Sequence, residues 1–277
     1  MNMLLTIFQK IRKSVYMFLY FLDSKVLKRN AEIIVICYHD IGEEGGFSVR
    51  LKDFIRQIEY LRTKYCPATL KDLEDHMEGK KKIKSPSFIL TFDDGYRGIL
   101  STVPYLERNR IKPTVFVISS KVKEKGQNDS YLSLPDLKAL MNKGWHIGNH
   151  SKSHIPLTGI NDLTMREEIL SSTQTLSESL GTKIRYFAYP YGRYNGKVTD
   201  RLSHNNYDLG LTMDDNTFDK VTNRYQIPRI GINKSHGFSE FKATISPSVI
   251  KFRAFAKKIG IGNLFSILMD LKDKSYD

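Results

Sequence analysis

Two adjacent carboxylates and two spaced histidines are the residues of this chain best suited to chemistry. Asp93 and Asp94 follow the apolar run 88–92 and precede Gly95. A short apolar run bounded by turn residues is typical of a buried strand, so both carboxylates lie where a strand leaves the core. Successive strand residues point in different directions, so one carboxylate can face a metal while the other faces substrate or water. Taken alone, the stretch is more typical of a solvated aspartate–glycine turn.

Two later stretches favour chemistry over a turn. His150 and His154 are four residues apart, which is metal-ligand spacing if the segment makes a helical turn. Residues 187–192 are an apolar strand end followed by an aromatic turn with proline and glycine. One carboxylate and two neutral imidazoles form a three-ligand site with open positions. That composition suits Zn²⁺, and equally Co²⁺, Ni²⁺, Fe²⁺ or Mn²⁺.

The three stretches, in this order, resemble the motifs of the polysaccharide deacetylase family, the carbohydrate esterases with a NodB-type domain. The resemblance covers roughly residues 33–233 and implies an α/β fold, a distorted (β/α)7 barrel. It also implies a divalent metal, with Zn²⁺ expected first. Its ligands would be Asp94, His150 and His154, and Asp93 would be the catalytic base.

The implied reaction is hydrolysis of the N-acyl amide of an amino sugar. A metal lowers the pKa of a bound water and polarises the amide carbonyl, and Asp93 takes the proton from that water. Tyr191 matches the residue whose backbone N–H, with the metal, holds the tetrahedral oxyanion. A general acid must then protonate the leaving amine, because an amide anion cannot leave.

The general acid is where the sequence departs from the usual pattern of the family. Members typically carry an apolar-X-His motif near the C-terminal end of the domain, and His236 in that region lacks the apolar context. His39 closes the apolar run 33–38 and resembles the permuted histidine motif of the branch that deacetylates biofilm poly-N-acetylglucosamine. We therefore predict His39 as the general acid, with Asp40 as a pocket or orienting residue and His236 as the alternative acid.

Two further departures concern the base and the substrate. Ala188 stands where many members have an arginine that orients the base, and Arg229, near another predicted strand end, is predicted to supply that charge. The usual Asp/Trp substrate motif is absent, and residues 212–215 occupy the corresponding region. Three residues near the motifs are the candidate substrate contacts: Asp40, Tyr189 and Asp214.

Alternating strands and helices must position these residues. Apolar runs predict strands at 33–38, 88–92, 114–118, 145–148, 184–188, 209–213 and 227–232. Amphipathic patterns predict helices at 51–65, 70–77, 99–109, 134–142, 163–180 and 198–204. Repeated strand–helix order predicts parallel strands with right-handed crossovers. All the polar motifs then lie at the carboxyl ends of strands, where barrel active sites gather.

The ends of the chain differ from this central domain, residues 31–246. Residues 1–30 carry six basic and one acidic side chain and residues 247–277 six basic and three acidic, so the ends hold +8 of the net charge of +13. Each end is predicted as a basic amphipathic helix, the second with a break at 260–262. The longest uninterrupted apolar run in the first end, 15–22, is shorter than the roughly 20 residues that span a bilayer. An interfacial helix and a helix packed on the barrel remain equal alternatives.

Composition also indicates which partners the protein binds and where in the cell it is located. No recognised nucleic-acid motif accompanies the basic residues, so an anionic membrane surface is the expected partner and nucleic acid is not. No small-residue cleavage site follows the first helix, and two cysteines form no disulfide framework. We therefore expect a peripheral protein on the cytosolic face of a bacterial inner membrane, with export to the cell envelope as the alternative.

The leading functional hypothesis is a metal-dependent N-deacetylase. Its substrate would be an amino sugar of a cell-envelope polysaccharide or of its lipid-linked precursor. The alternatives are a deformylase of a lipid-linked amino sugar and a catalytically inactive saccharide-binding module. The intact set of two carboxylates and two histidines argues against the inactive module.

Overall fold

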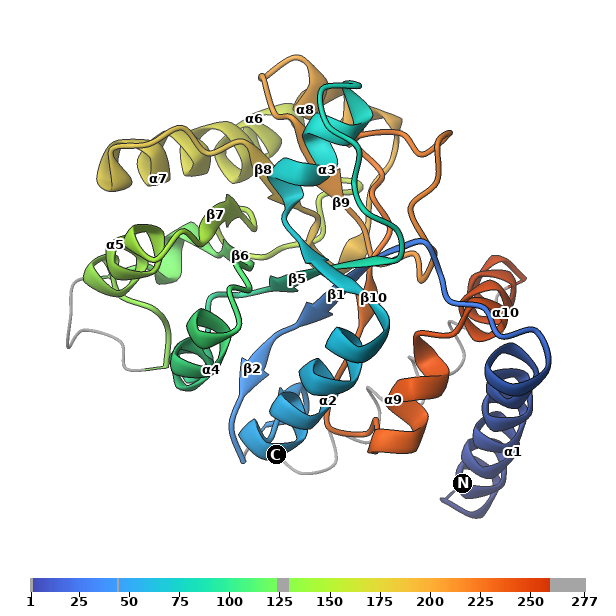
Figure 1. Cartoon of the computed structure of the whole chain (residues 1–277). Coiled ribbons are helices and arrows are strands. Elements are labelled where there is room, and N and C mark those ends of the chain that lie inside the picture. Colours follow the sequence, from blue (N-terminus) through green and yellow to red (C-terminus); the bar gives the residue numbers. More distant parts are fainter. Residues whose placement is uncertain (1, 44, 124–129, 260–277) are drawn as a thin grey trace.

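The protein is built around a parallel sheet that curls into a distorted (β/α)7 barrel, as predicted (Figure 1). The computed structural model describes residues 2–43, 45–123 and 130–259. The strand order is β10–β1–β5–β6–β7–β8–β9. The strands are β1 (Ile33–Tyr38), β5 (Ser87–Phe92), β6 (Thr114–Val117), β7 (His146–Asn149), β8 (Tyr186–Ala188), β9 (Leu209–Leu211) and β10 (Ile230–Gly231).

The two edges of this sheet approach each other through one residue. Ile227, just before β10, forms a parallel bridge to Leu211 of β9, and its N–H donates to the Gly210 carbonyl at 2.9 Å. Three short strands were not predicted. β4 (Cys66–Ala68) pairs with the first half of β5, and β2 (Asp40–Ile41) pairs with β3 (Ser48–Val49). Strands of two or three residues are too short to display a hydrophobic period.

Most predicted helices lie where expected. They are α2 (Leu51–Lys64), α3 (Leu70–Met77), α4 (Val103–Arg108) after the 3-10 turn η2 (Arg97–Thr102), α5 (Leu134–Asn142) and α8 (Gly196–Ser203). The helix predicted at 163–180 is α6 (Asp162–Arg166), the π turn η4 (Glu167–Ser171) and α7 (Ser172–Leu180) in one run. It ends at Gly181, whose φ of 65° is the left-handed conformation that glycine adopts at helix ends.

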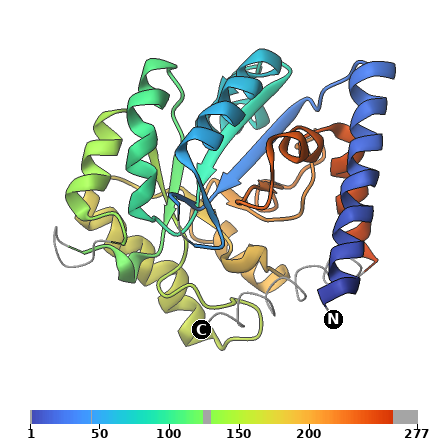
Figure 2. The same cartoon turned by 90° about the horizontal axis from the view of Figure 1, so that it is seen from below.

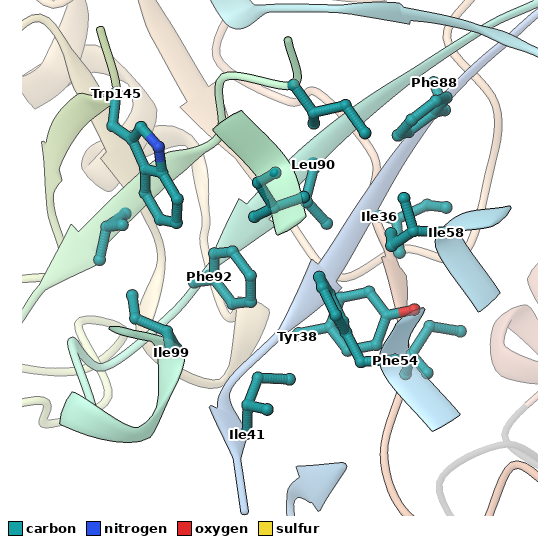
Figure 3. Close-up of a cluster of buried hydrophobic side chains, with 14 of the residues drawn as sticks. Ile36, Tyr38, Ile41, Phe54, Ile58, Phe88, Leu90, Phe92, Ile99 and Trp145 are labelled. Atoms are coloured by element: carbon teal, nitrogen blue, oxygen red, sulfur yellow. The ribbon is translucent and has the colours of Figure 1, made fainter. Parts of the chain in front are cut away.

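Both faces of the central strands are covered, so they read as continuous apolar runs. All six residues of β1 and of β5 are buried. The outward face packs against helices, and Figure 3 shows Phe92 next to Trp145, with ring centres 5.9 Å apart and planes at 7°. The inward face forms a second cluster that includes Val35, Ile89 and Phe116. This inner cluster fills the barrel interior below the polar residues of the strand ends.

The two ends of the chain pack together on one side of the barrel. Figures 1 and 2 show α1 (Asn2–Phe21), continued by the π turn η1 (Leu22–Val26), beside α9 (Phe238–Thr244) and α10 (Pro247–Lys258). Tyr16 of α1 is buried against Ala243 and Val249, while Ile11 and Phe18 are more than half exposed. The first end is therefore a packing helix on one face and presents apolar side chains on another.

Two predictions about the ends concern membrane-spanning helices and the break at 260–262. None of the helices in the described part of the chain combines the length and the apolar character that crossing a membrane requires. The predicted break at 260–262 lies outside the described residues. α9 was not predicted, because its seven residues make fewer than two turns of α-helix and show little period.

Candidate active site

The two carboxylates after β5 diverge because the backbone turns left-handed. Asp94 has φ 68° and Gly95 has φ 76°. A Cβ on Gly95 would lie 2.9 Å from Val117 Cγ1, so only glycine fits there. Asp93 consequently faces Arg229, and Asp94 faces the two histidines. The sequence predicted this divergence from strand alternation, but the left-handed turn is its cause.

Asp93 is clamped by a buried guanidinium. Arg229 Nη1 lies 2.6 Å from Asp93 Oδ1 and Nη2 lies 2.7 Å from Oδ2, a bidentate pair with Arg229 fully buried. Arg229 Nε donates to the Thr212 carbonyl at 3.1 Å, and the guanidinium packs 5.4 Å from the ring centre of Phe116. Burial opposes ionisation, but the charge and the hydrogen bonds of Arg229 outweigh it and hold the pKa of Asp93 below its usual range. Asp93 is therefore an ionised carboxylate at neutral pH.

Ala188 is a buried residue of β8. The alanine side chain belongs to the same inner cluster as Phe116, against which the guanidinium packs. An arginine at Ala188 would put a second guanidinium into this interior. Arg229, near β10, therefore pairs with Asp93 in place of an arginine on β8. The sequence suggested this contact.

Asp94, His150 and His154 converge as a candidate metal site. One ligand atom from each lies within 4.8 Å of the other two, and both Nε2 atoms are 3.4 Å from Asp94 Oδ1. His150 Nδ1 is 2.8 Å from the Ala188 carbonyl oxygen, so that nitrogen carries the proton and Nε2 presents its lone pair. Asp94 Oδ1 is buried and has no hydrogen-bond partner among the described residues. These donors fit a divalent cation bound by one carboxylate oxygen and two imidazole nitrogens.

His150 and His154 converge without the helical turn on which their spacing argument was conditional. The segment is a loop, with Ser151 at φ 68° and His154 at φ 63°. Glu168, 4% exposed in the π turn η4, holds this loop: its Oε2 accepts from Lys152 N at 3.0 Å and Ser153 N at 2.9 Å. π turns within helices are frequent at functional sites. Sequence reasoning missed Glu168, because nothing marks it among the other acidic residues of its helix.

We expect Glu168→Gln to weaken metal binding by about 10–100-fold, the usual cost of losing a group that orients a ligand. The amide keeps one acceptor oxygen but loses the charge that stabilises two backbone N–H donors next to His154. Competition titration with a chelating dye measures the affinity, and circular dichroism checks the fold. Glu167→Gln is the matched control, because its side chain is 62% exposed and pairs with Lys152 at the surface. Equal affinities in the two variants would contradict the positioning role of Glu168.

His39 lies beside the base. Ligand atoms of Cys37, His39 and Asp93 all fall within 4.8 Å of one another, and the His39 ring lies 5.1 Å from that of Phe47. His39 Nδ1 is buried and has no hydrogen-bond partner in the described part of the chain. Burial lowers the pKa of His39, opposed by the charges of Asp93 and Asp94. The structure thus brings His39 to the carboxylate, and its role as acid stays a prediction.

His236 has a different environment. Its Nδ1 lies 3.1 Å from Asn233 Oδ1, and burial, with the charges of Arg253 and Arg12, lowers the pKa of His236 to about 3. This imidazole is neutral at physiological pH. It lies on the side of the barrel where the terminal helices pack, and it belongs to neither cluster of ligand atoms found in the described residues.

The three candidate substrate contacts lie in different environments. Tyr189 was predicted wrongly: its side chain is fully buried and its hydroxyl donates to the Tyr225 carbonyl at 2.8 Å, so it belongs to the core. Asp40 accepts from Ser48 Oγ at 3.0 Å, and its other oxygen has no hydrogen-bond partner among the described residues. Asp214 accepts from Tyr194 at 2.9 Å and lies 3.4 Å from Lys257 Nζ, so it ties a loop to α10.

Tyr191 contacts the candidate metal site, and a tyrosine pair follows the aspartate–glycine turn. Tyr191, in the 3-10 turn η5 (Pro190–Gly192), is 60% exposed, and its ring lies 4.6 Å from that of His154. Tyr96 and Tyr131 stack at 4.9 Å, and Tyr96 directly follows the aspartate–glycine turn. Sequence reasoning missed Tyr96 and Tyr131 as neighbours, although the position of Tyr96 two residues after Asp94 was a usable signal.

Backbone strain gathers at the same place. Eight non-glycine residues have positive φ in the described ranges, and four of them line this site: Asp94, Ser151, His154 and Tyr191. Such conformations cost free energy and persist where the surroundings impose them, which is typical of active sites. The strain therefore marks the candidate active site independently of residue chemistry.

The chain is similar to known deacetylases in sequence and in fold. The family model of polysaccharide deacetylases matches residues 80–210. The poly-beta-1,6-N-acetyl-D-glucosamine N-deacetylase of Staphylococcus aureus is 26% identical over 204 residues, which are 69% of this chain and 70% of that protein. Among solved structures, the Streptococcus pyogenes deacetylase PplD in complex with acetate has a TM-score of 0.70 at 21% identity, covering 79% of this chain and 100% of that one. IcaB from Ammonifex degensii has a TM-score of 0.67 at 23% identity, covering 78% and 98%.

The fold is a distorted parallel barrel with a polar site at the carboxyl ends of its strands, where the active sites of barrel enzymes lie. Residues 80–210, which match the family model of polysaccharide deacetylases, include Asp93, Asp94, His150 and His154.

Proposed function

We propose that this protein is a hydrolase that removes N-acetyl groups from the amino sugars of a cell-envelope polysaccharide. The observation that carries the proposal is the clamped carboxylate Asp93 next to the triad of Asp94, His150 and His154. The similar Staphylococcus aureus protein is named for poly-beta-1,6-N-acetyl-D-glucosamine, so a polymer of N-acetylglucosamine is the substrate class we favour. The donor set of one carboxylate and two imidazoles suits Zn²⁺.

The residues divide the work of amide hydrolysis. A divalent cation bound by the triad would polarise the acyl oxygen and acidify a water molecule. Asp93 accepts a proton from the attacking water, because Arg229 keeps it ionised and oriented. The Tyr191 N–H stabilises the developing oxyanion. His39 delivers a proton to the departing sugar amine, which requires it to be protonated at that step.

Two alternatives share the site but differ in substrate or outcome. A lipid-linked amino sugar, deacetylated or deformylated, would use the same base and metal ligands. An inactive saccharide-binding module would keep the aromatic side chains around the site without turnover. The paired Asp93 and Arg229 argue against inactivity, since a buried ion pair is costly to retain without a function.

The test is release of primary amine and acetate by the full chain loaded with Zn²⁺. β-1,6-linked N-acetylglucosamine oligomers, β-1,4-linked oligomers and lipid-linked saccharides are compared at equal concentration of acetyl groups. We expect stoichiometric amine and acetate, fastest from the β-1,6 oligomers. Formate instead of acetate would support the deformylase. Oligomer binding without either acid would support the inactive module.

We also propose a peripheral association with an anionic membrane surface. Ile11 and Phe18 on α1 and Phe255 on α10 are exposed apolar side chains next to exposed basic ones. Such combinations are typical of interfacial helices, and the attraction is screened by salt. Flotation of the full chain with vesicles of acidic lipid, at low and at high salt, is the measurement. Binding that salt leaves unchanged would contradict the electrostatic part.

A further inference from the structure

A basic pocket lies far from the catalytic residues, where the chain passes from α1 into the barrel. Its volume is about 420 Å³, and it is lined by residues of η1, the end of α2 and the connection from α9 to α10. Five basic side chains line it, and Asp23 is the one acidic residue among its described lining. We propose that this pocket binds a phosphate-bearing ligand, and that the ligand is the headgroup of an anionic lipid.

The single acid does not neutralise the pocket. Asp23 is 1% exposed, accepts from Arg29 Nε at 2.8 Å, and accepts from Ser248 N at 2.7 Å and Ser248 Oγ at 3.0 Å. Its carboxylate is therefore used by Arg29 and by the first turn of α10. The four other cations of the lining are Lys25, Lys28, Lys64 and Lys242. None of them pairs with a carboxylate in the described part of the chain. Their combined charge stays available to an anion.

Lys242 is held in place before any ligand arrives. Its ammonium lies 5.7 Å from the ring centre of Tyr20, 5.9 Å from that of Tyr60 and 5.2 Å from that of Phe238. Cation–π contacts of this kind fix a long side chain, so less freedom is lost when an anion binds. The hydroxyls of Tyr20 and Tyr60 are 3.4 Å apart. Whichever of them accepts in that contact retains its own hydrogen for a ligand oxygen.

Phosphate is the anion that this arrangement suits. Several ammonium groups around one concavity match a group that carries more than one negative charge and three acceptor oxygens. A pocket of about 420 Å³ lies in the range of small-molecule sites and has room for more than the phosphate itself. A phosphate with an attached polar group, as in a lipid headgroup, fits both the charge and the volume.

The rim of the pocket indicates a lipid. Phe21, Val26 and Leu27 are 53%, 59% and 52% exposed, and Val26 and Leu27 lie between Lys25 and Lys28 of the lining in the sequence. Exposed apolar side chains interleaved with lysines at one turn are typical of segments that enter the headgroup region of a bilayer. A soluble phosphate compound would need the lysines but not the apolar side chains.

The location separates this pocket from catalysis. Lys28 and Arg29 precede β1, whereas His39 follows it, so the pocket and the active site lie at opposite ends of a six-residue strand. Such a strand is about 20 Å long. A sugar joined directly to a phosphate in this pocket would not reach Asp93. The pocket therefore anchors the protein and leaves the active site open to a long polysaccharide.

The experiment compares the full chain with the double variant Lys28→Gln/Lys242→Gln. The control is Lys138→Gln/Lys220→Gln, which removes two exposed lysines outside the lining and changes the net charge equally. Flotation uses vesicles of phosphatidylcholine with and without phosphatidylglycerol. Calorimetry measures the affinity of each protein for glycerol phosphate and for inorganic phosphate in solution. Amine release from a soluble oligomer and thermal melting are recorded for all three proteins.

We expect the pocket variant to bind phosphatidylglycerol vesicles about 30-fold more weakly, since each of the two basic residues contributes about fivefold at such a surface. The control should change little, and both variants should keep the wild-type oligomer turnover and melting temperature. Loss of glycerol phosphate binding in the pocket variant, with vesicle binding unchanged, would keep the phosphate site but overturn the lipid. Equal losses in the two variants, or no phosphate binding by the wild type, would overturn the site itself.

Discussion

Asp93→Asn is expected to retain bound metal and to lose turnover, by about 10²–10⁴-fold. Asparagine has almost the shape of aspartate, but its amide cannot accept the proton of the attacking water. The metal ligands Asp94, His150 and His154 remain in place, because the left-handed backbone at Asp94 and Gly95 does not depend on the charge of Asp93. Metal analysis of the purified variant and the rate of amine release are the two measurements.

The ligand variants should behave in the opposite way. Asp94→Ala, His150→Ala and His154→Ala each remove one donor from a set of three, so metal content and turnover should fall together. The melting temperature is measured as well, because Asp93→Asn removes the negative charge that pairs with buried Arg229. Wild-type turnover in a folded Asp93→Asn protein would show that another group is the base.

The sequence was informative where the chemistry sits directly at strand ends. The apolar runs before His39 and Asp93 predicted β1 and β5 because strands buried on both faces carry no polar interruption. Parallel order then placed both residues at one edge of the sheet. The pairing of Asp93 with Arg229 spans 136 residues, and it followed only from the expectation that both lie at that edge.

Contacts that depend on side-chain packing could not be predicted. The loop from His150 to His154 keeps its shape through Glu168 and through positive φ angles, and neither leaves a sequence pattern. Tyr189 was misassigned because a tyrosine at a strand end can face the solvent or the core. Its hydroxyl satisfies a carbonyl of a distant loop, which only the folded chain reveals.

The charge of the ends illustrates the same limit. The excess of basic residues is visible in the sequence, but the pocket combines Lys25 and Lys28 with Lys64 and Lys242, which are brought together by the packing of α1 on α9. The helix buries Tyr16 and still exposes Ile11 and Phe18, so packing leaves a second face for the proposed membrane contact. The two alternatives for this segment, interfacial or packed, are therefore not exclusive.

His39→Ala is expected to reduce the turnover of an N-acetylated oligomer by about 10²–10⁴-fold, whereas His236→Ala should change it little. His39 lies next to Asp93 with Nδ1 free of hydrogen bonds to the described residues. His236 instead contacts Asn233 and belongs to neither cluster of ligand atoms in the described residues, and burial with the charges of Arg253 and Arg12 lowers its pKa to about 3. The measurement is kcat for both variants at saturating oligomer.

A second substrate separates proton donation from structural support. An aryl acetate has a phenolate as its leaving group, and a phenolate departs without being protonated by a general acid. His39→Ala should therefore hydrolyse this ester at close to the wild-type rate. Similar losses on both substrates would mean that His39 supports the geometry of Asp93 instead of donating a proton. A larger loss in His236→Ala than in His39→Ala would restore the usual order of the family motifs and assign the acid to the C-terminal side of the domain.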